Sequence, residues 1–284
     1  MTNGQHSGPT LADLREAAEA IWPTATAEPW DRVGLVAGRG EDPLHRVLLA
    51  VDAVRATVDE ALEWRADALF THHPLLLRGV HSVAEDTGKG ALLADLIRGR
   101  CALYSAHTNA DQPEGGVSSV IAERLGLLGA QAIVPAEGPG EVFGIGRIGE
   151  LPESMPLREF AERVAAIMPA TAGGVRVAGD PGRPVRRIAL LGGAGDSLLD
   201  HPLVRGADAY LTSDLRHHPA QESVELSLAA GGPALVDVAH WASESLWLEG
   251  AAELLAERLP GVEFRVSRLR TDPWDFAVGA EPAH

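Results

Sequence analysis

The stretch Ala66-Asp67-Ala68-Leu69-Phe70-Thr71-His72-His73-Pro74 decides the fold expected for this chain. It begins as a short apolar run typical of a buried strand, and Pro74 ends that strand because proline has no backbone N–H to donate. Two adjacent histidines therefore stand at the predicted carboxyl end of a strand. Ligands of α/β proteins bind at that end of the sheet, so the pair is either a metal-binding element or two ordinary solvated loop histidines.

Predicted strands and helices alternate on both sides of this stretch. Thr10 is a candidate N-cap for the first helix. In chain order the predicted elements are helix Leu11–Trp22, strand Val47–Val51, helix Val54–Trp64, strand Ala66–Phe70, helix Ala91–Arg98, strand Ala102–Ala106, helix Val117–Leu128, strand Val142–Gly149 and helix Leu157–Met168. This alternation predicts an α/β protein with a parallel sheet.

The first half of the chain recurs in the second half at a constant spacing. Arg187–Leu191 resembles Arg46–Ala50, and Ala207–Thr212 resembles Ala66–Thr71, in both cases 141 residues further on (46 to 187 and 71 to 212). We interpret this as an internal duplication. The alternative is chance similarity between Ala-rich α/β units.

A third internal similarity links two predicted strands that both end in histidine. Ala102–His107 resembles Ala234–His240 with one inserted residue, and each histidine is followed four residues later by a carboxylate, Asp111 or Glu244. The Pro/Gly-rich stretch Pro135–Gly140 predicts a linker. We therefore expect a first α/β lobe over residues 1–134 and a second over 135–284, with the C-terminal segment able to pack back on the first lobe.

Composition limits the classes of partner. The 284 residues carry a formal net charge of −16 with Lys89 as the only lysine, which argues against nucleic acid and anionic membranes as partners. Cys101 is the only cysteine, so an internal disulfide is excluded and a reducing cytoplasm is expected. The sequence has no apolar run long enough to span a bilayer.

Histidines and carboxylates gather at the predicted strand ends. Because His240 and Glu244 open a predicted helix four residues apart, they share one of its faces. Nitrogen and oxygen ligands without thiolate suit zinc, iron or manganese. Two such ions about 3.5–4 Å apart, bridged by a carboxylate, form a hydrolytic site. The groups concerned are His72, His73, His107, Asp111, Asp214, His240 and Glu244.

The Gly-rich run Gly192–Asp196 follows another predicted strand. It is either a phosphate-binding loop at a helix start or a plain tight turn. No Lys-Ser/Thr pair follows it, which favours the turn.

Several of these motifs resemble one family. The sequence is similar to the dinuclear metal-centre proteins called the NGG-one-interacting factor three family, which are also named type 2 homologues of GTP cyclohydrolase 1. The departures are Arg32, where the family usually has asparagine, and Ser213, where it often has glycine. The matching stretches are Trp30–Leu35, Thr71–Pro74, Ser105–Asp111, Gly192–Asp196, Thr212–His218 and His240–Glu244.

This resemblance implies two similar α/β lobes related by a pseudo-two-fold axis, a metal site in the cleft between them, and a homohexamer. His107 and Asp214 are expected beside the metals, acting on water or substrate. With the metal pair and the reducing compartment inferred above, we expect a cytoplasmic, metal-dependent hydrolase acting on a nucleotide or another phosphorylated small molecule; the family's name implies GTP. The alternative is a non-catalytic metal-binding or partner-binding regulatory protein. The implied metal ligands are His72, His73, Asp111, His240 and Glu244, with Glu244 bridging two ions.

Overall fold

The computed structural model describes residues 8–136 and 143–279, and they form two compact units. The first unit contains the chain up to Ala110 together with Trp247–Thr271, and the second contains Asp111–Leu246 and the segment from Asp272. The division therefore lies at Ala110, not after residue 134, and it places Asp111 with the second unit. Most of the linker predicted at Pro135–Gly140, and Val142 at the start of a predicted strand, lie outside the described residues.

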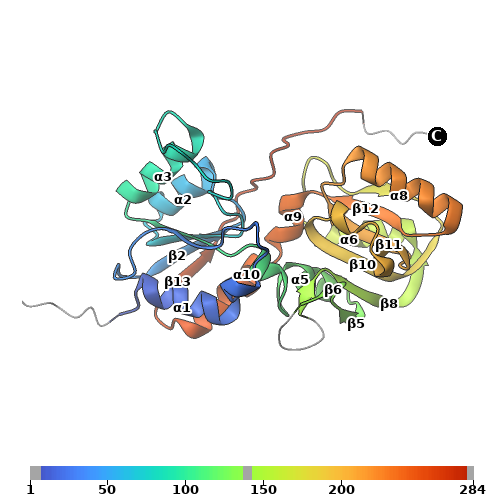
Figure 1. Cartoon of the computed structure of the whole chain (residues 1–284), viewed down its shortest axis with the longest axis horizontal. Coiled ribbons are helices and arrows are strands. Elements are labelled where there is room, and N and C mark those ends of the chain that lie inside the picture. Colours follow the sequence, from blue (N-terminus) through green and yellow to red (C-terminus); the bar gives the residue numbers. More distant parts are fainter. Residues whose placement is uncertain (1–7, 137–142, 280–284) are drawn as a thin grey trace, which may run out of the picture. The chain divides into compact units, whose positions relative to one another are not determined.

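A five-stranded sheet forms the centre of the first unit. Its strands are parallel except for β1, which pairs antiparallel with β4 at one edge. Figure 1 shows helices α2 and α3 on one face of this sheet and α1 and α10 on the other. The strand order is β1 (Gly34–Ala37), β4 (Ala102–Ser105), β3 (Ala68–Thr71), β2 (Arg46–Ala50) and β13 (Glu263–Val266). The helices are α1 (Leu11–Ile21), α2 (Arg55–Glu63), α3 (Gly88–Arg98), the short α4 (Thr108–Asp111) at the unit boundary, and α10 (Leu248–Arg258).

Helices on both faces explain why the central strands read as continuous apolar runs. Every residue of β3 and β4 is buried, and Leu48, Leu69 and Leu103 are fully enclosed in one hydrophobic cluster. The cap predicted for the first helix is confirmed, because the Thr10 hydroxyl accepts from the Asp13 amide and the Asp13 carboxylate accepts from the Thr10 amide.

A six-stranded sheet forms the centre of the second unit. Strands β10, β11 and β12 are parallel, whereas β8 and β9 run antiparallel to their neighbours. The order is β5 (Leu128–Gln131), β8 (Arg147–Pro156), β10 (Pro184–Ala194), β11 (Ala209–Ser213), β12 (Ala234–Val238) and β9 (Arg176–Ala178), and β6 (Val134–Pro135) pairs separately with β7 (Gly144–Ile145). The helices are α5 (Val117–Arg124), α6 (Leu157–Ile167), α7 (Pro202–Arg205), α8 (His217–Ala230) and α9 (His240–Ser245).

The 141-residue spacing seen in the sequence recurs in the strand pairing. Val47 faces Ala68 across β2 and β3, and Ile188 faces Ala209 across β10 and β11. In both units an aspartate just before the second strand fastens the first strand. Asp67 accepts from the amides of residues 45 and 46 at 2.7 and 2.9 Å, and Asp208 accepts from those of residues 186 and 187 at 2.8 Å.

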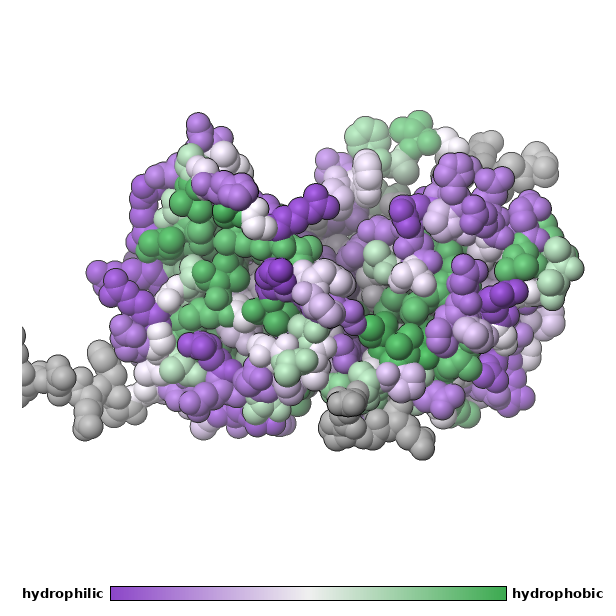
Figure 2. Space-filling view, viewed as in Figure 1, coloured by the Kyte–Doolittle hydropathy of each residue, from purple (hydrophilic) through white to green (hydrophobic). Residues whose placement is uncertain are grey.

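Two element predictions need adjustment. The helix expected over Val117–Leu128 ends at Arg124, because Leu128 already begins the edge strand β5. The Gly-rich run after Leu191 continues strand β10 as far as Ala194, and only a three-residue 3₁₀ helix, Asp196–Leu198, follows it. Within the described residues, no helix has both the length and the apolar content needed to cross a bilayer. Hydrophilic residues cover much of the visible surface of each unit, in keeping with the acidic composition (Figure 2).

Candidate metal-binding groups

Three histidines of the first unit come together at the carboxyl ends of β3 and β4. His72 and His73 follow β3, and His107 follows β4. Their ring centroids lie 5.2 to 5.5 Å apart, and one nitrogen of each ring lies within 4.8 Å of one nitrogen of each of the other two. His72 is completely buried and packs beside the indole of Trp247. The structure thus brings these three predicted site residues together.

An oxygen atom fixes the orientation of each of these imidazoles. His72 Nδ1 donates to the carbonyl of Ala106 at 2.9 Å, and His73 Nδ1 donates to Asp52 Oδ1 at 2.7 Å. A carbonyl can only accept a hydrogen bond, so the proton of neutral His72 is on Nδ1 and Nε2 carries the lone pair. Oxygen acceptors behind the distal nitrogen are the usual support of metal-ligating histidines.

Asp31 holds the third imidazole. It accepts from His107 Nδ1 at 2.9 Å, and from the amide and hydroxyl of Thr108 at 3.0 and 2.5 Å. Burial alone would raise the pKa of Asp31, but the hydrogen bonds from His107 and Thr108 outweigh it and hold this pKa well below its usual range. Asp31 is therefore ionised at neutral pH and favours the His107 tautomer with the lone pair on Nε2.

The sequence did not identify Asp31 or Asp52 as parts of the site. Asp31 lies inside the motif Trp30–Leu35, and Asp52 directly follows a predicted strand. Their positions in the sequence could therefore have marked both as candidate site residues. Their role depends on which histidine each one contacts, and those contacts join residues 76 and 21 positions apart.

The second unit brings together His240, Glu244 and Asp214. His240 begins α9, and its Nδ1 donates to Asp214 Oδ2 at 2.8 Å. This contact lowers the pKa of Asp214. Asp214 follows β11 with a φ of 54°, a left-handed conformation that aspartate tolerates better than most residues. Glu244 is buried one turn further along α9, and its Oε1 lies 2.8 Å from His240 Nε2.

The contact between His240 and Glu244 fits a bound cation. Asp214 already takes the Nδ1 proton of a neutral His240, so Nε2 and Glu244 Oε1 are both electron-pair donors. Two such atoms 2.8 Å apart repel each other unless a proton or a metal ion lies between them. Nitrogen and oxygen donors of this kind suit zinc, iron and manganese.

Gly193 leaves the space that these donors need. A Cβ at this position would lie 2.7 Å from Glu244 Oε1 and 3.5 Å from His240 Nε2. The Gly193 amide donates to Ser243 Oγ at 3.0 Å, and Ser243 Oγ donates to the carbonyl of His240 at 2.8 Å, so this glycine also braces the start of α9. At Gly195 a Cβ would collide with Thr212 Oγ1 at 2.1 Å. The Gly-rich run thus serves close packing.

Asp111 ends α4 and lies near a buried arginine. Arg147 donates to the carbonyls of Gln112 and Pro113 at 3.0 and 2.9 Å, which fixes the backbone that follows Asp111. Burial lowers the pKa of Arg147 to about 10, and the charges of Asp111 and Glu114 oppose that shift. Within the described residues, the three-histidine group does not include Asp111.

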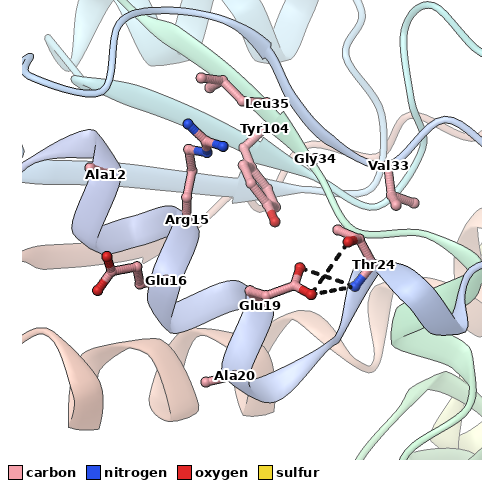
Figure 3. A pocket seen from close by; sticks show the side chains of 10 residues that line it. All are labelled: Ala12, Arg15, Glu16, Glu19, Ala20, Thr24, Val33, Gly34, Leu35 and Tyr104. Carbon is pink, nitrogen blue, oxygen red and sulfur yellow. Dashed lines mark hydrogen bonds between the residues drawn. The ribbon is translucent and has the colours of Figure 1, made fainter.

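A separate groove lies between α1 and the edge strand β1, with a volume of about 800 Å³. Figure 3 shows Arg15 and Glu19 reaching into it from α1 and Tyr104 from β4, with the Glu19 carboxylate bonded to Thr24. Burial raises the pKa of Tyr104 to about 12, so its hydroxyl is neutral. The residues that line this groove include none of the predicted site residues.

An α/β protein that carries imidazoles and carboxylates at its strand ends is a candidate metal-binding protein. Comparison with protein families makes this class specific. The chain belongs to the Duf34/NIF3 (NGG1p interacting factor 3) family, whose model matches residues 9–273.

Curated relatives cover nearly the whole chain. A protein of Streptomyces coelicolor named GTP cyclohydrolase 1 type 2 homolog is 47% identical over 281 residues, which is 96% of this chain and 96% of that protein. A protein of Clostridium perfringens with the same name is 33% identical, over 94% of this chain and 99% of its own length.

Solved structures share the fold. A NIF3-related protein of Bacillus cereus superposes with a TM-score of 0.86 at 24% identity, covering 95% of this chain and 99% of its own. A Staphylococcus aureus protein superposes with a TM-score of 0.84 at 26% identity, covering 95% of this chain and 100% of its own.

Proposed function

We propose that this protein is a metal-dependent hydrolase that holds two divalent metal ions, zinc, iron or manganese, with Glu244 touching both. The observation that carries the proposal is the support behind the imidazoles. His72, His73 and His240 each donate from Nδ1 to an oxygen, so each presents Nε2 as a ligand. The proposed ligand set is His72, His73, Asp111, His240 and Glu244.

In this proposal both units contribute ligands to one metal site. Unit one offers imidazoles, and unit two offers Glu244, His240 and Asp111, so neither set alone holds two ions. The repeated strand register supports two similar α/β lobes related by a pseudo-two-fold axis, with the site in the cleft between them. Family membership supports a homohexamer as the assembled form.

His107 and Asp214 have different tasks in this proposal. The ions supply Lewis acidity, which lowers the pKa of water and polarises the group attacked. Asp31 keeps His107 Nδ1 protonated, so Nε2 is the atom that accepts a proton from the attacking water. Asp214 holds His240 in its ligating tautomer and acts through that residue.

The substrate class follows from charge and from the relatives. Five ligands with two carboxylates leave two divalent ions with net positive charge, which attracts an anionic group despite the acidic surface. The names of the relatives refer to GTP cyclohydrolase. We therefore propose a nucleotide or another phosphorylated small molecule as substrate.

The test uses the full chain purified without an affinity tag and loaded with Zn²⁺ or Mn²⁺. Turnover of GTP and of bis-p-nitrophenyl phosphate is compared between wild type, Glu244→Gln and Glu222→Gln. Glu222→Gln is the control, because it makes the same change on an exposed face of α8. We expect activity in wild type and Glu222→Gln only. His107→Ala should lower turnover by roughly 10²–10⁴-fold and keep most of the metal.

Equal turnover by wild type and Glu244→Gln would overturn the enzymatic proposal. If metal binding is then normal, the protein is a metal-binding regulatory protein and not a hydrolase. Elemental analysis of the untagged protein from its own host identifies the metal in either case.

A further inference from the structure

Trp30 is a large aromatic residue exposed beside the three histidines. Its side chain lies in the loop before β1, and the residue is 55% exposed. The indole meets the His107 ring edge to face, with 5.8 Å between centroids and an interplanar angle of 79°. A single exposed apolar side chain is ordinary, but this one stands directly beside the histidine group, and so large an apolar ring gains free energy when a ligand covers it.

The backbone around Trp30 is fastened to the same strand end that carries His107. The Glu28 amide donates to Thr108 Oγ1 at 2.9 Å, and the Asp31 carboxylate accepts from the Thr108 amide at 3.0 Å. The Asp31 amide donates to the carbonyl of Glu28 at 2.9 Å and closes a turn with Trp30 inside it. The backbone that carries the exposed indole is thus fixed, and a tryptophan side chain has only two rotatable bonds to order when it is covered.

We propose that Trp30 stacks on the planar ring of the substrate and makes this site selective for nucleobase-containing phosphates. This inference rests on the proposed function and adds the substrate class. Aromatic side chains bind bases by stacking on their π-faces, whichever base is present. A base stacked on Trp30 would lie next to His107, with its sugar and phosphate directed to the histidine cluster. A sugar phosphate without a base would not use the indole.

Binding of two probes separates the base from the phosphate. Equilibrium dialysis of the Zn²⁺-loaded full chain measures the Kd of GMP and of ribose 5-phosphate. The variants are Trp30→Ala, Trp30→Phe and, as a control, Ile97→Ala. Ile97 is 60% exposed near the end of α3, which leads into the amino end of β4, away from the carboxyl end that carries His107.

We expect Trp30→Ala to weaken GMP binding by about ten- to a hundredfold and to leave ribose 5-phosphate unchanged. Trp30→Phe should weaken GMP binding only a few-fold, because a smaller aromatic ring still stacks. Ile97→Ala should bind both probes as wild type does. Metal content and thermal unfolding, measured on every variant, should be unchanged.

Three results would overturn the stacking proposal. If GMP and ribose 5-phosphate bind wild type equally and Trp30→Ala affects neither, the base is not recognised and the proposed function still stands. If Trp30→Ala weakens both probes equally, or changes the sedimentation of the protein, the indole has a structural role. If wild type binds neither probe, the proposal for phosphorylated substrates fails together with the stacking.

Discussion

The two units use one strand arrangement to present different chemistry. At the end of β3 stand His72 and His73, and 141 residues later, at the end of β11, stand Ser213 and Asp214. The first pair supplies two imidazoles, whereas Asp214 supplies a carboxylate that orients an imidazole from elsewhere. Backbone pairing depends on main-chain groups and tolerates this exchange, so the strand ends diverge in chemistry while the sheets stay alike.

The neighbouring strand shows the same division of roles. Asp52 follows β2 and holds His73, and the corresponding position 141 residues later is Gly193, at the end of β10. A carboxylate in the first unit is thus replaced by empty space in the second, and Glu244 from α9 reaches that space. The comparison teaches that, at this strand position, the first unit supplies a carboxylate that orients an imidazole, while the second leaves room for a carboxylate from a helix.

The largest expected effect comes from removing the charge of the Glu244 carboxylate. Glu244→Gln should lose most of its metal, with affinity falling at least about 10²-fold, because an amide bridges two cations poorly. Metal per chain is measured by elemental analysis after dialysis. Retention of two ions at unchanged affinity would show that the second unit does not supply the bridge.

A methyl group added at Gly193 tests whether metal binding needs the space beside Glu244. Gly193→Ala places a Cβ 2.7 Å from Glu244 Oε1 and should weaken metal binding by about 10–100-fold. The control is Gly231→Ala, since Gly231 has nearly the same φ, 78° against 75°, but a Cβ added there would meet no atom within 4 Å. Both variants place an alanine at a positive φ, so equal metal affinities in isothermal titration would contradict the role of Gly193.

Acid titration compares a carboxylate from each unit. The folded pKa of Asp31 is depressed, so its stabilising contribution is full above about pH 4 and is lost as the pH falls towards that folded pKa. Asp31→Asn should therefore destabilise the metal-free protein by about 1–3 kcal/mol at pH 7 and by progressively less below pH 4. Thermal unfolding from pH 7 to pH 3 measures the difference.

For Asp237, in the second unit, we expect the opposite dependence of stability on pH. Burial raises its pKa, so its ionisation costs stability as the pH rises above about 4. The difference between wild type and Asp237→Asn should therefore change with pH in the opposite direction to that of Asp31→Asn. Parallel pH profiles for the two variants would contradict these assignments.

The smallest expected effect tests whether the units are built alike. Asp67→Asn and Asp208→Asn each weaken two hydrogen bonds to backbone amides at the start of equivalent strands. Each change should lower the free energy of unfolding, measured by urea denaturation, by about 1 kcal/mol. The metal content should stay unchanged. A large cost for one variant and none for the other would show that the repeated register does not reflect equivalent anchoring.

Much of the architecture could be predicted from local patterns. Apolar runs marked β2, β3 and β4, and the capping residue Thr10 marked the start of α1. The edge strands β9 and β13 were missed because each has partly exposed, mixed residues and depends on a partner strand distant in sequence. The compact units divide at Ala110, whereas the sequence indicated a break after residue 134, and Trp247–Thr271 belongs to the first unit through β13.

The sequence by itself determined the α/β class, the internal spacing of 141 residues and the histidines that end strands, because strand periodicity and proline act locally. Only the tertiary structure decided which oxygen supports which imidazole. Asp31 with His107, Asp52 with His73 and Asp214 with His240 are contacts between segments that are separated along the chain. The chain positions of two residues do not fix whether their side chains meet, because the sheet brings its strand ends together only after it has folded.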